Sequence, residues 1–264
     1  MMDLVPGMPP VAGLDVPAHA LVCGASSGIG LAMVTRLVGN REVGSVCAVS
    51  RSATRSPALL ELHRAAGKRL LLVDADLTDE AAIAQLADTL EARGVPLHLV
   101  AHVAGLLHDG EVKPEKSIAQ VNLHALQRVF AINAFAPILL ARALMPLLAR
   151  GQPVVFASLS ARVGSIGDNR AGGWYAYRAS KAAQNQLMKT FSVELARRNR
   201  HACCLLLHPG TVDTPLSAPF HARVAEGKLF SAQRAAAQLL AIIAAATPAD
   251  SGRFVAWDGS DVPW

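Results

Sequence analysis

The sequence predicts an α/β fold: a single domain built on a doubly wound, seven-stranded parallel sheet with helices on both faces. Short runs of continuously apolar residues alternate with helical segments over most of the chain, which is typical of parallel strands buried on both sides. The first apolar run leads into a glycine-rich turn and then a helix, an arrangement that binds phosphate groups in such sheets. At 264 residues the chain is long enough for one domain with a substantial core.

The elements follow from the pattern of apolar residues and their breakers. Residues 1–17 are rich in proline and lack periodicity, so they are expected to form a loose N-terminal tail before a domain of residues 18–264. Strands are predicted where apolar runs are bounded by glycine, proline or charge, at residues 20–23, 45–49, 69–73, 97–103, 153–157, 202–207 and 253–257. Helices are predicted at residues 28–38, 57–66, 79–92, 123–149, 174–198 and 232–246. The tract 123–149 is expected to break near Pro137.

Composition argues against several classes of function. Hydrophobic residues make up 52% of the chain and charged residues 17%, but no apolar run is expected to reach the length of a bilayer span. The net charge is +5, and the basic residues are scattered instead of forming a stripe. Neither a membrane nor a nucleic acid is therefore an expected partner.

The cysteines and the N-terminus indicate the compartment. Cys23, Cys47, Cys203 and Cys204 lie in strand-like apolar runs, and we expect buried free thiols. None of them has metal-ligand spacing, so no metal is predicted. The first residues show neither a basic region nor an uninterrupted apolar region, so we expect no secretory signal and a cytoplasmic location.

Tyr177 and Lys181 stand four residues apart in a predicted helix, which places both side chains on one face. An ammonium group favours the phenolate, so we expect the pKa of Tyr177 to fall from about 10 toward neutrality. Such a phenol can donate a proton to a carbonyl oxygen or accept one from an alcohol. The alternative is an ordinary surface pair. Tyr175 is not a candidate, because Ala179 lies four residues after it.

The glycine turn lets the backbone turn sharply and approach a pyrophosphate at the helix N-terminus. Its spacing, G-x-x-x-G-x-G, differs from the common G-x-G-x-x-G pattern, and a plain strand-to-helix turn is the alternative. The residues expected to bind a dinucleotide cofactor here are Gly24, Ser26, Ser27, Gly28, Ile29 and Gly30.

Together, the glycine turn and the Tyr177–Lys181 pair resemble the short-chain dehydrogenase/reductase family, over residues 18–257. The resemblance implies a Rossmann-like fold, a nicotinamide cofactor, and an active site made of a serine, the Tyr-x-x-x-Lys pair and a helix asparagine. Residues 164–166, 174–178 and 208–211 are similar to the branch that contains small carbonyl reductases and the bacterial C-factor signalling protein.

The end of the second strand indicates which nicotinamide cofactor is used. An acidic residue here would favour NAD(H), but residues 49–52 read Val-Ser-Arg-Ser. The guanidinium of Arg51 suits the 2′-phosphate of NADP(H), which is therefore preferred, with NAD(H) possible; the alternative is a solvated loop cation. The resemblance implies that Asp76 and Leu77 contact the adenine ring, although Asp76 also fits a turn or cap before the next helix.

After the fourth strand the family usually carries Asn-Asn-Ala-Gly, whereas this chain reads His102-Val103-Ala104-Gly105. Ala104 and Gly105 are expected to allow the backbone close to the cofactor. Both asparagines are missing, which puts their sheet-bracing hydrogen bonds in question. His102 is interpreted as a structural residue.

A hydroxyl at the end of the fifth strand is expected to point into the ligand crevice and bind the substrate oxygen. Ser158 and Ser160 both fit, because Leu159 splits the serine pair of the family; Ser160 is favoured. The resemblance implies that Asn133 is the helix asparagine that holds a water in a proton relay behind the lysine. Asn122 is a competitor that fits a helix cap better.

The segment after the sixth strand, residues 208–214, resembles the Pro-Gly segment of the family. The resemblance implies that Pro209, Gly210 and Val212 line the cofactor, with the backbone of Val212 on the carboxamide and the hydroxyl of Thr214 on a phosphate. Residues 215–230 are then expected to close over the substrate and set specificity.

The implied reaction is reduction of a ketone or aldehyde by NADPH. Ser160 and Tyr177 would hold the carbonyl oxygen, Tyr177 would deliver the proton, Lys181 would lower its pKa and hold the nicotinamide ribose, and Asn133 would support proton resupply. Two alternatives are an NAD(P)-linked alcohol dehydrogenase acting oxidatively and a cofactor-binding signalling protein with weak catalysis. The usual interface of the family, around Asn133 and Tyr177, implies a homodimer or homotetramer.

Overall fold

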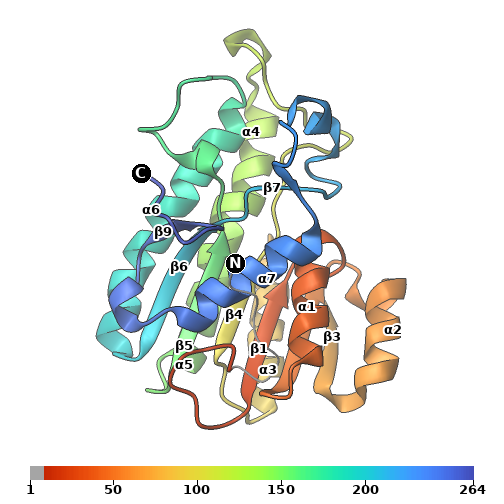
Figure 1. Ribbon diagram of the computed structural model, residues 1–264, viewed down its shortest axis with the longest axis vertical. Coiled ribbons are helices and arrows are strands. Elements are labelled where there is room, and N and C mark those ends of the chain that lie inside the picture. The colour runs from red at the N-terminus through yellow and green to blue at the C-terminus, as the bar shows by residue number, and fades with distance from the viewer. Residues whose placement is uncertain (1–8) are drawn as a thin grey trace.

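Seven parallel strands form the central sheet, in the order β3-β2-β1-β4-β5-β6-β9 (Figure 1). The computed structural model describes residues 9–264 of the chain. The strands are β1 (Ala18–Cys23), β2 (Val43–Ser50), β3 (Leu70–Asp74), β4 (Leu99–His102), β5 (Val154–Leu159), β6 (Ala202–His208) and β9 (Phe254–Ala256). All neighbouring strands pair in parallel. The predicted doubly wound sheet is confirmed, and its direction of winding reverses between β1 and β4.

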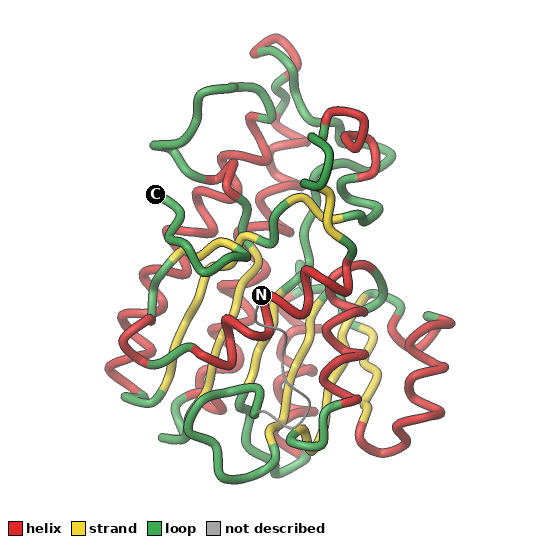
Figure 2. The backbone as a smooth tube through the Cα atoms, viewed as in Figure 1, coloured by secondary structure: helices red, strands yellow, loops and turns green. Residues whose placement is uncertain are grey.

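Helices cover both faces of the sheet (Figure 2). One face carries α1 (Gly28–Gly39), α2 (Pro57–Ala66) and α7 (Ala232–Ala245), and the other carries α3 (Glu80–Ala92), α5 (Ala136–Leu148) and α6 (Tyr175–Arg198). Successive strand residues point to opposite faces, so Ala20 and Val22 enter one core while Leu21 and Cys23 enter the other. Burial on both faces explains why the strands are continuously apolar.

The carboxyl ends of the strands share one edge of the sheet, because all strands run the same way. The loops that leave this edge gather at the upper end of the molecule in Figure 1. They include the turn after β1, the segment after β4, the loop after β5 and the segment after β6. These four segments carry the predicted glycine turn, Ala104 and Gly105, Ser160, and residues 209–214, whereas the other predicted site residues follow β2 and β3 or lie on helices.

The predicted helix 123–149 consists of three parts: α4 (Leu123–Phe130), a π-helical turn at Ala131–Phe135, and α5. The irregular turn therefore comes directly before Ala136 and Pro137, near the predicted break, and the chain stays helical through it.

The expectation that nothing in the chain is long and apolar enough for a bilayer span was wrong. By length and composition, the helical stretch Leu123–Leu148 could cross a membrane, because its most apolar 18 residues have a mean hydropathy of 1.7. Half of these residues are buried within the molecule, where α5 packs against α3 and α6. A core helix passes the same test of length and composition.

Two further features differ from the predictions. Of the expected loose tail, residues 1–8 lie outside the described residues, but Val11 is only 2% exposed and belongs to the core. The chain also forms a small two-stranded parallel sheet from β7 (Thr211–Val212) and β8 (Leu229–Phe230). Both strands are only two residues long, too short for an apolar run to reveal them.

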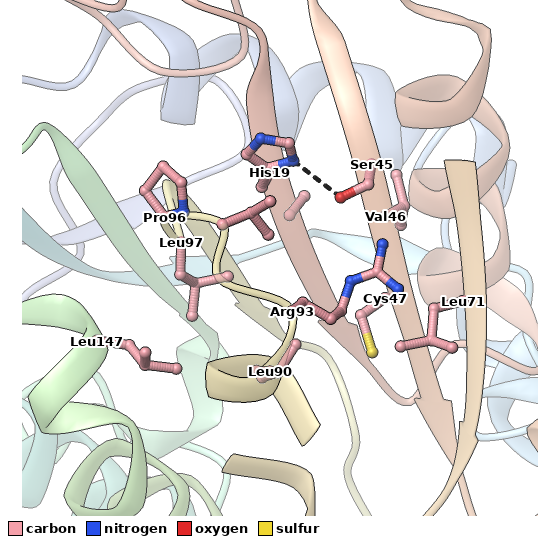
Figure 3. Close-up of a pocket in the computed structure, with 12 residues that line it drawn as sticks. His19, Ser45, Val46, Cys47, Leu71, Leu90, Arg93, Pro96, Leu97 and Leu147 are labelled. Atoms are coloured by element: carbon pink, nitrogen blue, oxygen red, sulfur yellow. Dashed lines mark hydrogen bonds between the residues drawn. The ribbon is translucent and has the colours of Figure 1, made fainter. Parts of the chain in front are cut away.

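Two hollows are found away from the predicted site. A cavity of about 20 Å³ lies at the amino-terminal edge of the sheet, where the His19 ring bonds to the Ser45 hydroxyl at 2.8 Å (Figure 3); it has room for about one water molecule. A larger hollow of about 650 Å³ lies beside α7 and β9, lined in part by Arg234 and Trp257.

Candidate active site

The glycine turn packs closely against two of the other predicted cofactor segments. Gly24 has φ +86°, and a Cβ there would lie 2.6 Å from the backbone nitrogen of Ala104. Gly28 has φ +52°, and a Cβ there would lie 2.9 Å from Cγ2 of Thr214. Both positions therefore require glycine, for conformation and for space. The turn after β1, the segment after β4 and the segment after β6 meet here.

The N-terminus of α1 is suited to hold a pyrophosphate. Ser27 is the N-cap residue and its side chain makes no capping hydrogen bond within the described chain. The first N–H groups of a helix have no intrahelical partner, and the helix dipole favours negative charge there. Gly24 and Gly28 leave no room for a side chain, so the backbone of the turn is free to approach a ligand. The turn therefore fits the phosphates of a dinucleotide.

Arg51 follows β2 directly and is exposed. Asp76, after β3, accepts two hydrogen bonds from Thr78, from the backbone N–H at 2.9 Å and from the hydroxyl at 2.7 Å. Burial alone would raise the pKa of Asp76, but these bonds and the charges of Arg51 and Arg128 hold it below its usual value. Asp76 thus acts as a turn residue, as one of its two interpretations predicted, and it lies within electrostatic reach of Arg51. The side chain of Leu77 packs in the core.

Tyr177 and Lys181 lie on the buried face of α6, with exposed fractions of 8% and 3%. The Lys181 Nζ is 5.8 Å from the centroid of the Tyr177 ring. It donates hydrogen bonds to the backbone oxygen of Leu159, at 2.8 Å, and to Oε1 of Gln184, at 2.9 Å. The pair is therefore not an ordinary surface pair. The hydroxyl of Tyr177 has no hydrogen-bond partner among the described residues.

The expected fall in the pKa of Tyr177 was wrong for the protein in this state. Burial raises the pKa of Tyr177 above its usual value, and burial lowers the pKa of Lys181 to about 7. Removing a side chain from water disfavours its charged form, which is the phenolate for tyrosine and the ammonium for lysine. The sequence spacing brings the two groups together, but it does not reveal how deeply both are buried.

The two candidate serines have different partners. Ser158, at 0% exposure, accepts a hydrogen bond from Nε2 of Gln184 at 2.7 Å. Ser160, one residue past the end of β5, donates its hydroxyl proton to Oδ1 of Asn185 at 2.6 Å. Gln184 and Asn185 are adjacent on α6, so both serines are tied to the helix that carries Tyr177.

Asn133 lies in the π-helical turn, fully buried. Its Nδ2 donates to the backbone oxygen of Leu106 at 2.8 Å and to the hydroxyl of Ser180 at 3.0 Å, and its Oδ1 accepts from the N–H of Leu106 at 2.7 Å. A Cβ on Gly105 would lie 3.5 Å from this Oδ1 and 3.8 Å from Nζ of Lys181. Asn133 thus joins the segment after β4 to α6. Asn122 caps α4 through Ala125, as expected.

His102, at the end of β4, is fully buried, and neither ring nitrogen has a hydrogen-bond partner within the described residues. Burial, together with the charge of Lys181, lowers its pKa to about 3. His102 is therefore neutral at ordinary pH. This fits its interpretation as a structural residue.

The segment after β6 turns at Gly210, which has φ +79° and lies against the rings of Phe230 and Trp257. Two residues later, Val212 is buried in β7. Further along, Phe220 packs against Trp174 with ring centroids 4.8 Å apart. Leu216 and Phe220 belong with Trp174 and Tyr177 to one apolar cluster, so this segment packs against the residues around Tyr177.

Sequence reasoning missed Glu115, which fixes the start of α6. The carboxylate is 3% exposed and accepts a hydrogen bond from the N–H of Ala176, at 3.2 Å from the nearer oxygen. The backbone oxygen of the same residue accepts from Trp174, which has φ +53° and makes no side-chain cap. No local sequence pattern indicates this cap, because its acceptor lies 61 residues before Ala176 and not at the N-cap position of the helix.

Replacing Glu115 by alanine is expected to lower the free energy of unfolding by about 1–2 kcal/mol, as for the loss of a helix cap, because the first turn of α6 loses its acceptor. Urea unfolding measures this. Glu115→Gln keeps an acceptor oxygen and is expected to retain most of the stability. Equal stability of the alanine variant and the wild type would contradict the capping role.

The comparisons with known proteins agree with this geometry. The family profile described as short chain dehydrogenase matches residues 18–225. A 1-hydroxy-2-glutathionyl-2-methyl-3-butene dehydrogenase of Rhodococcus sp. (strain AD45) is 36% identical over 189 residues, which cover 72% of this chain and 78% of that protein. The C-signal protein of Myxococcus xanthus is 34% identical over 148 residues, 56% of this chain and 84% of that protein.

Solved structures of carbonyl reductases share the fold over nearly the whole chain. The NADPH-bound carbonyl reductase from chicken fatty liver has a TM-score of 0.82 at 28% identity, covering 95% of this chain and all of that one. The carbonyl reductase Sniffer of Drosophila melanogaster has a TM-score of 0.83 at 25% identity, covering 94% of this chain and all of that one. The chain belongs to the short chain dehydrogenase family and is an NAD(P)-dependent oxidoreductase.

Proposed function

We propose that this protein reduces the carbonyl group of a small ketone or aldehyde with NADPH. The observation that carries the proposal is the convergence of Ser160, Tyr177 and Lys181 at the carboxyl edge of the sheet, next to a glycine turn that fits a dinucleotide. The carbonyl reductases among the similar structures support the same direction of reaction.

Each catalytic residue has a role that follows from its chemistry. NADPH, when bound, supplies the hydride that reduces the carbonyl carbon. The Ser160 hydroxyl turns its proton from Oδ1 of Asn185 to the carbonyl oxygen of the substrate, and Tyr177 donates to the same oxygen and gives it a proton. The raised pKa of Tyr177 keeps it protonated before the reaction, as a proton donor requires. The Lys181 ammonium stabilises the phenolate that forms, and Asn133 maintains the packing of the segment after β4 against α6.

The surroundings of Tyr177 favour an apolar substrate. The side chains of Leu107, Val112, Trp174, Leu216 and Phe220 form one apolar cluster with it. A charged group on the substrate would lose its hydration here without a partner. We therefore assign an uncharged carbonyl compound as the substrate class.

A second candidate is oxidation of an alcohol with NAD(P), because the relative from Rhodococcus is named a dehydrogenase. The same three side chains serve this direction, with Tyr177 as the proton acceptor. The two directions differ in the pH at which they are fastest. Oxidation needs Tyr177 in its deprotonated form, and because the pKa of Tyr177 is raised, this form becomes available only at higher pH.

Cofactor binding tests the proposal first. Replacing Arg51 by alanine is expected to weaken NADPH binding about 10- to 100-fold, the worth of hydrogen bonds to a charged group, and to leave NADH binding unchanged. Fluorescence titration of wild type and variant with both cofactors measures this. Arg64→Ala, an exposed arginine near the other end of α2, is the matched control. Tighter binding of NADH than NADPH to the wild type would contradict the phosphate role of Arg51.

A further inference from the structure

Gln184 is a fully buried amide that lies one turn after Lys181 on α6. Its Oε1 accepts a hydrogen bond from Nζ of Lys181 at 2.9 Å. Its Nε2 donates to the hydroxyl of Ser158 at 2.7 Å and to the backbone oxygen of Leu159 at 3.1 Å. Burying an amide costs free energy unless it is hydrogen-bonded, and here three bonds fix its position.

These bonds make a chain from the sheet to the lysine. Ser158 is rigid because it lies within β5, in register with His102 of β4 and Leu206 of β6. Gln184 is held by Ser158 and by the carbonyl of Leu159, and the same carbonyl is the second acceptor of Lys181, at 2.8 Å. The Lys181 ammonium thus donates to two acceptors, the Leu159 carbonyl and Oε1 of Gln184. These two bonds hold Nζ at 5.8 Å from the centroid of the Tyr177 ring.

We propose that Gln184, fixed by Ser158, is a positioning residue that holds the Lys181 side chain beside Tyr177 and keeps it in the ammonium form. The inference rests on the catalytic role of Lys181 proposed above. It also gives Ser158 a role distinct from that of Ser160: Ser158 supports the lysine, while Ser160 is left for the substrate oxygen.

The electrostatics explain why such a residue is needed. Burial lowers the pKa of Lys181 to about 7, so at neutral pH the ammonium form is much less favoured than for a lysine in water. A hydrogen-bond acceptor favours the charged form of an amine and raises its pKa. Without Oε1 of Gln184, Lys181 would lose its proton at a lower pH, and the phenolate of Tyr177 would lose its stabilising charge.

Few other charges act on Lys181. Two titratable side chains interact with it: the Tyr177 ring on its own helix, and His102 on β4, whose pKa of about 3 leaves it neutral. The charged side chains on the elements packed against α6 have partners of their own, and the two thiols and the imidazole on β6 have shifted pKa values. These groups are Arg128 of α4 with Asp109, His124 of α4 with Glu111, Arg142 of α5 with Glu80, Arg162 of η5 (Arg162–Gly164) with Asp168, and Cys203, Cys204 and His208 of β6.

Three variants test the proposal, with a fourth as control. Gln184→Leu removes the acceptor at similar volume, and Gln184→Glu replaces it by a carboxylate. Ser158→Ala removes the support of the Gln184 amide. Gln186→Leu, an exposed glutamine on the same helix, controls for the change from glutamine to leucine.

Two readouts are measured for each variant. The first is the pH profile of kcat for NADPH-dependent reduction of 9,10-phenanthrenequinone, used as a probe carbonyl. The second is the pKa of Lys181 itself, by ¹³C NMR titration of lysine-labelled protein without cofactor or substrate, with the signal assigned by Lys181→Arg. If Gln184 had a merely structural role, its replacement would lower kcat at every pH and would change neither the pKa in the kcat profile nor the pKa of Lys181.

Gln184→Leu is expected to move the alkaline limb of the kcat profile, and the Lys181 pKa, down by about one unit or more. Gln184→Glu is expected to move both up by about the same amount, because an opposite charge favours the ammonium. Ser158→Ala should give a smaller downward shift, and Gln186→Leu none. Opposite shifts in the two Gln184 variants establish the positioning role.

An unchanged Lys181 pKa in both Gln184→Leu and Gln184→Glu overturns the proposal. If either variant fails to fold, Ser158→Ala decides by the same titration. Failure of the proposed function looks different: the wild type then reduces no probe carbonyl, or Tyr177→Phe keeps full activity. In that case the NMR titration still decides whether Gln184 controls the lysine.

Discussion

Replacing Tyr177 by phenylalanine is expected to lower kcat for carbonyl reduction by about 10²- to 10⁴-fold, the usual contribution of a positioned general acid. The ring stays in its apolar cluster with Trp174 and Phe220. Only the hydroxyl is lost, and it has no hydrogen-bond partner among the described residues, so the fold is expected to persist. Steady-state kinetics with NADPH and a probe carbonyl measure the change.

A matched control lies two residues earlier in the chain. Tyr175 is 40% exposed at the start of α6, and Ala179 stands where a lysine partner would be. Tyr175→Phe is therefore expected to keep wild-type kcat. NADPH binding, followed by fluorescence, should be nearly the same in both variants. If Tyr177→Phe retained full activity with bound NADPH, another group would have to donate the proton, and the proposed mechanism would fail.

The fold could be predicted from the sequence because its strands are buried on both faces. That burial requires continuous apolar runs, which stand out against the helices between them. The boundary of β4 was less accurate: the predicted 97–103 is the strand Leu99–His102. Leu97 and Val103 are apolar because they pack at the ends of the strand, and composition alone does not separate packing from strand pairing.

The candidate site could be predicted only as far as short-range spacing allows. Tyr177 and Lys181 are four residues apart, so helical geometry joins them. The residues that support them come from elsewhere or carry no motif: Glu115 reaches α6 from a distant loop, and Gln184 is a glutamine in a helix of mixed composition. Burial also reversed the expected shift in the pKa of Tyr177. Desolvation depends on the whole fold, and no local pattern encodes it.

The second large effect is expected at Gly30, in the first turn of α1. A Cβ there would overlap the backbone carbonyl of Gly24 and lie 3.2 Å from Cα of Ala25. Backbone atoms cannot yield as a flexible side chain can, so Gly30→Ala must open the turn. The N-terminus of α1 then moves away from the position that fits the pyrophosphate. We expect at least a 100-fold loss of affinity for NADPH and NADH alike, with overpacking that costs about 1–3 kcal/mol of stability.

Gly39, at the other end of the same helix, supplies the control. A Cβ there meets nothing within 4 Å, so Gly39→Ala is expected to stabilise the protein by about 0.5–1 kcal/mol and to leave cofactor binding unchanged. Fluorescence titration and urea unfolding of both variants separate the two quantities. If Gly30→Ala lost stability but still bound both cofactors tightly, the turn would serve the packing of α1 on the sheet, and the dinucleotide would have to bind elsewhere. Loss of binding to both cofactors, together with the NADPH-specific loss expected for Arg51→Ala, would instead separate the part of the site that holds the pyrophosphate from the part that selects the 2′-phosphate.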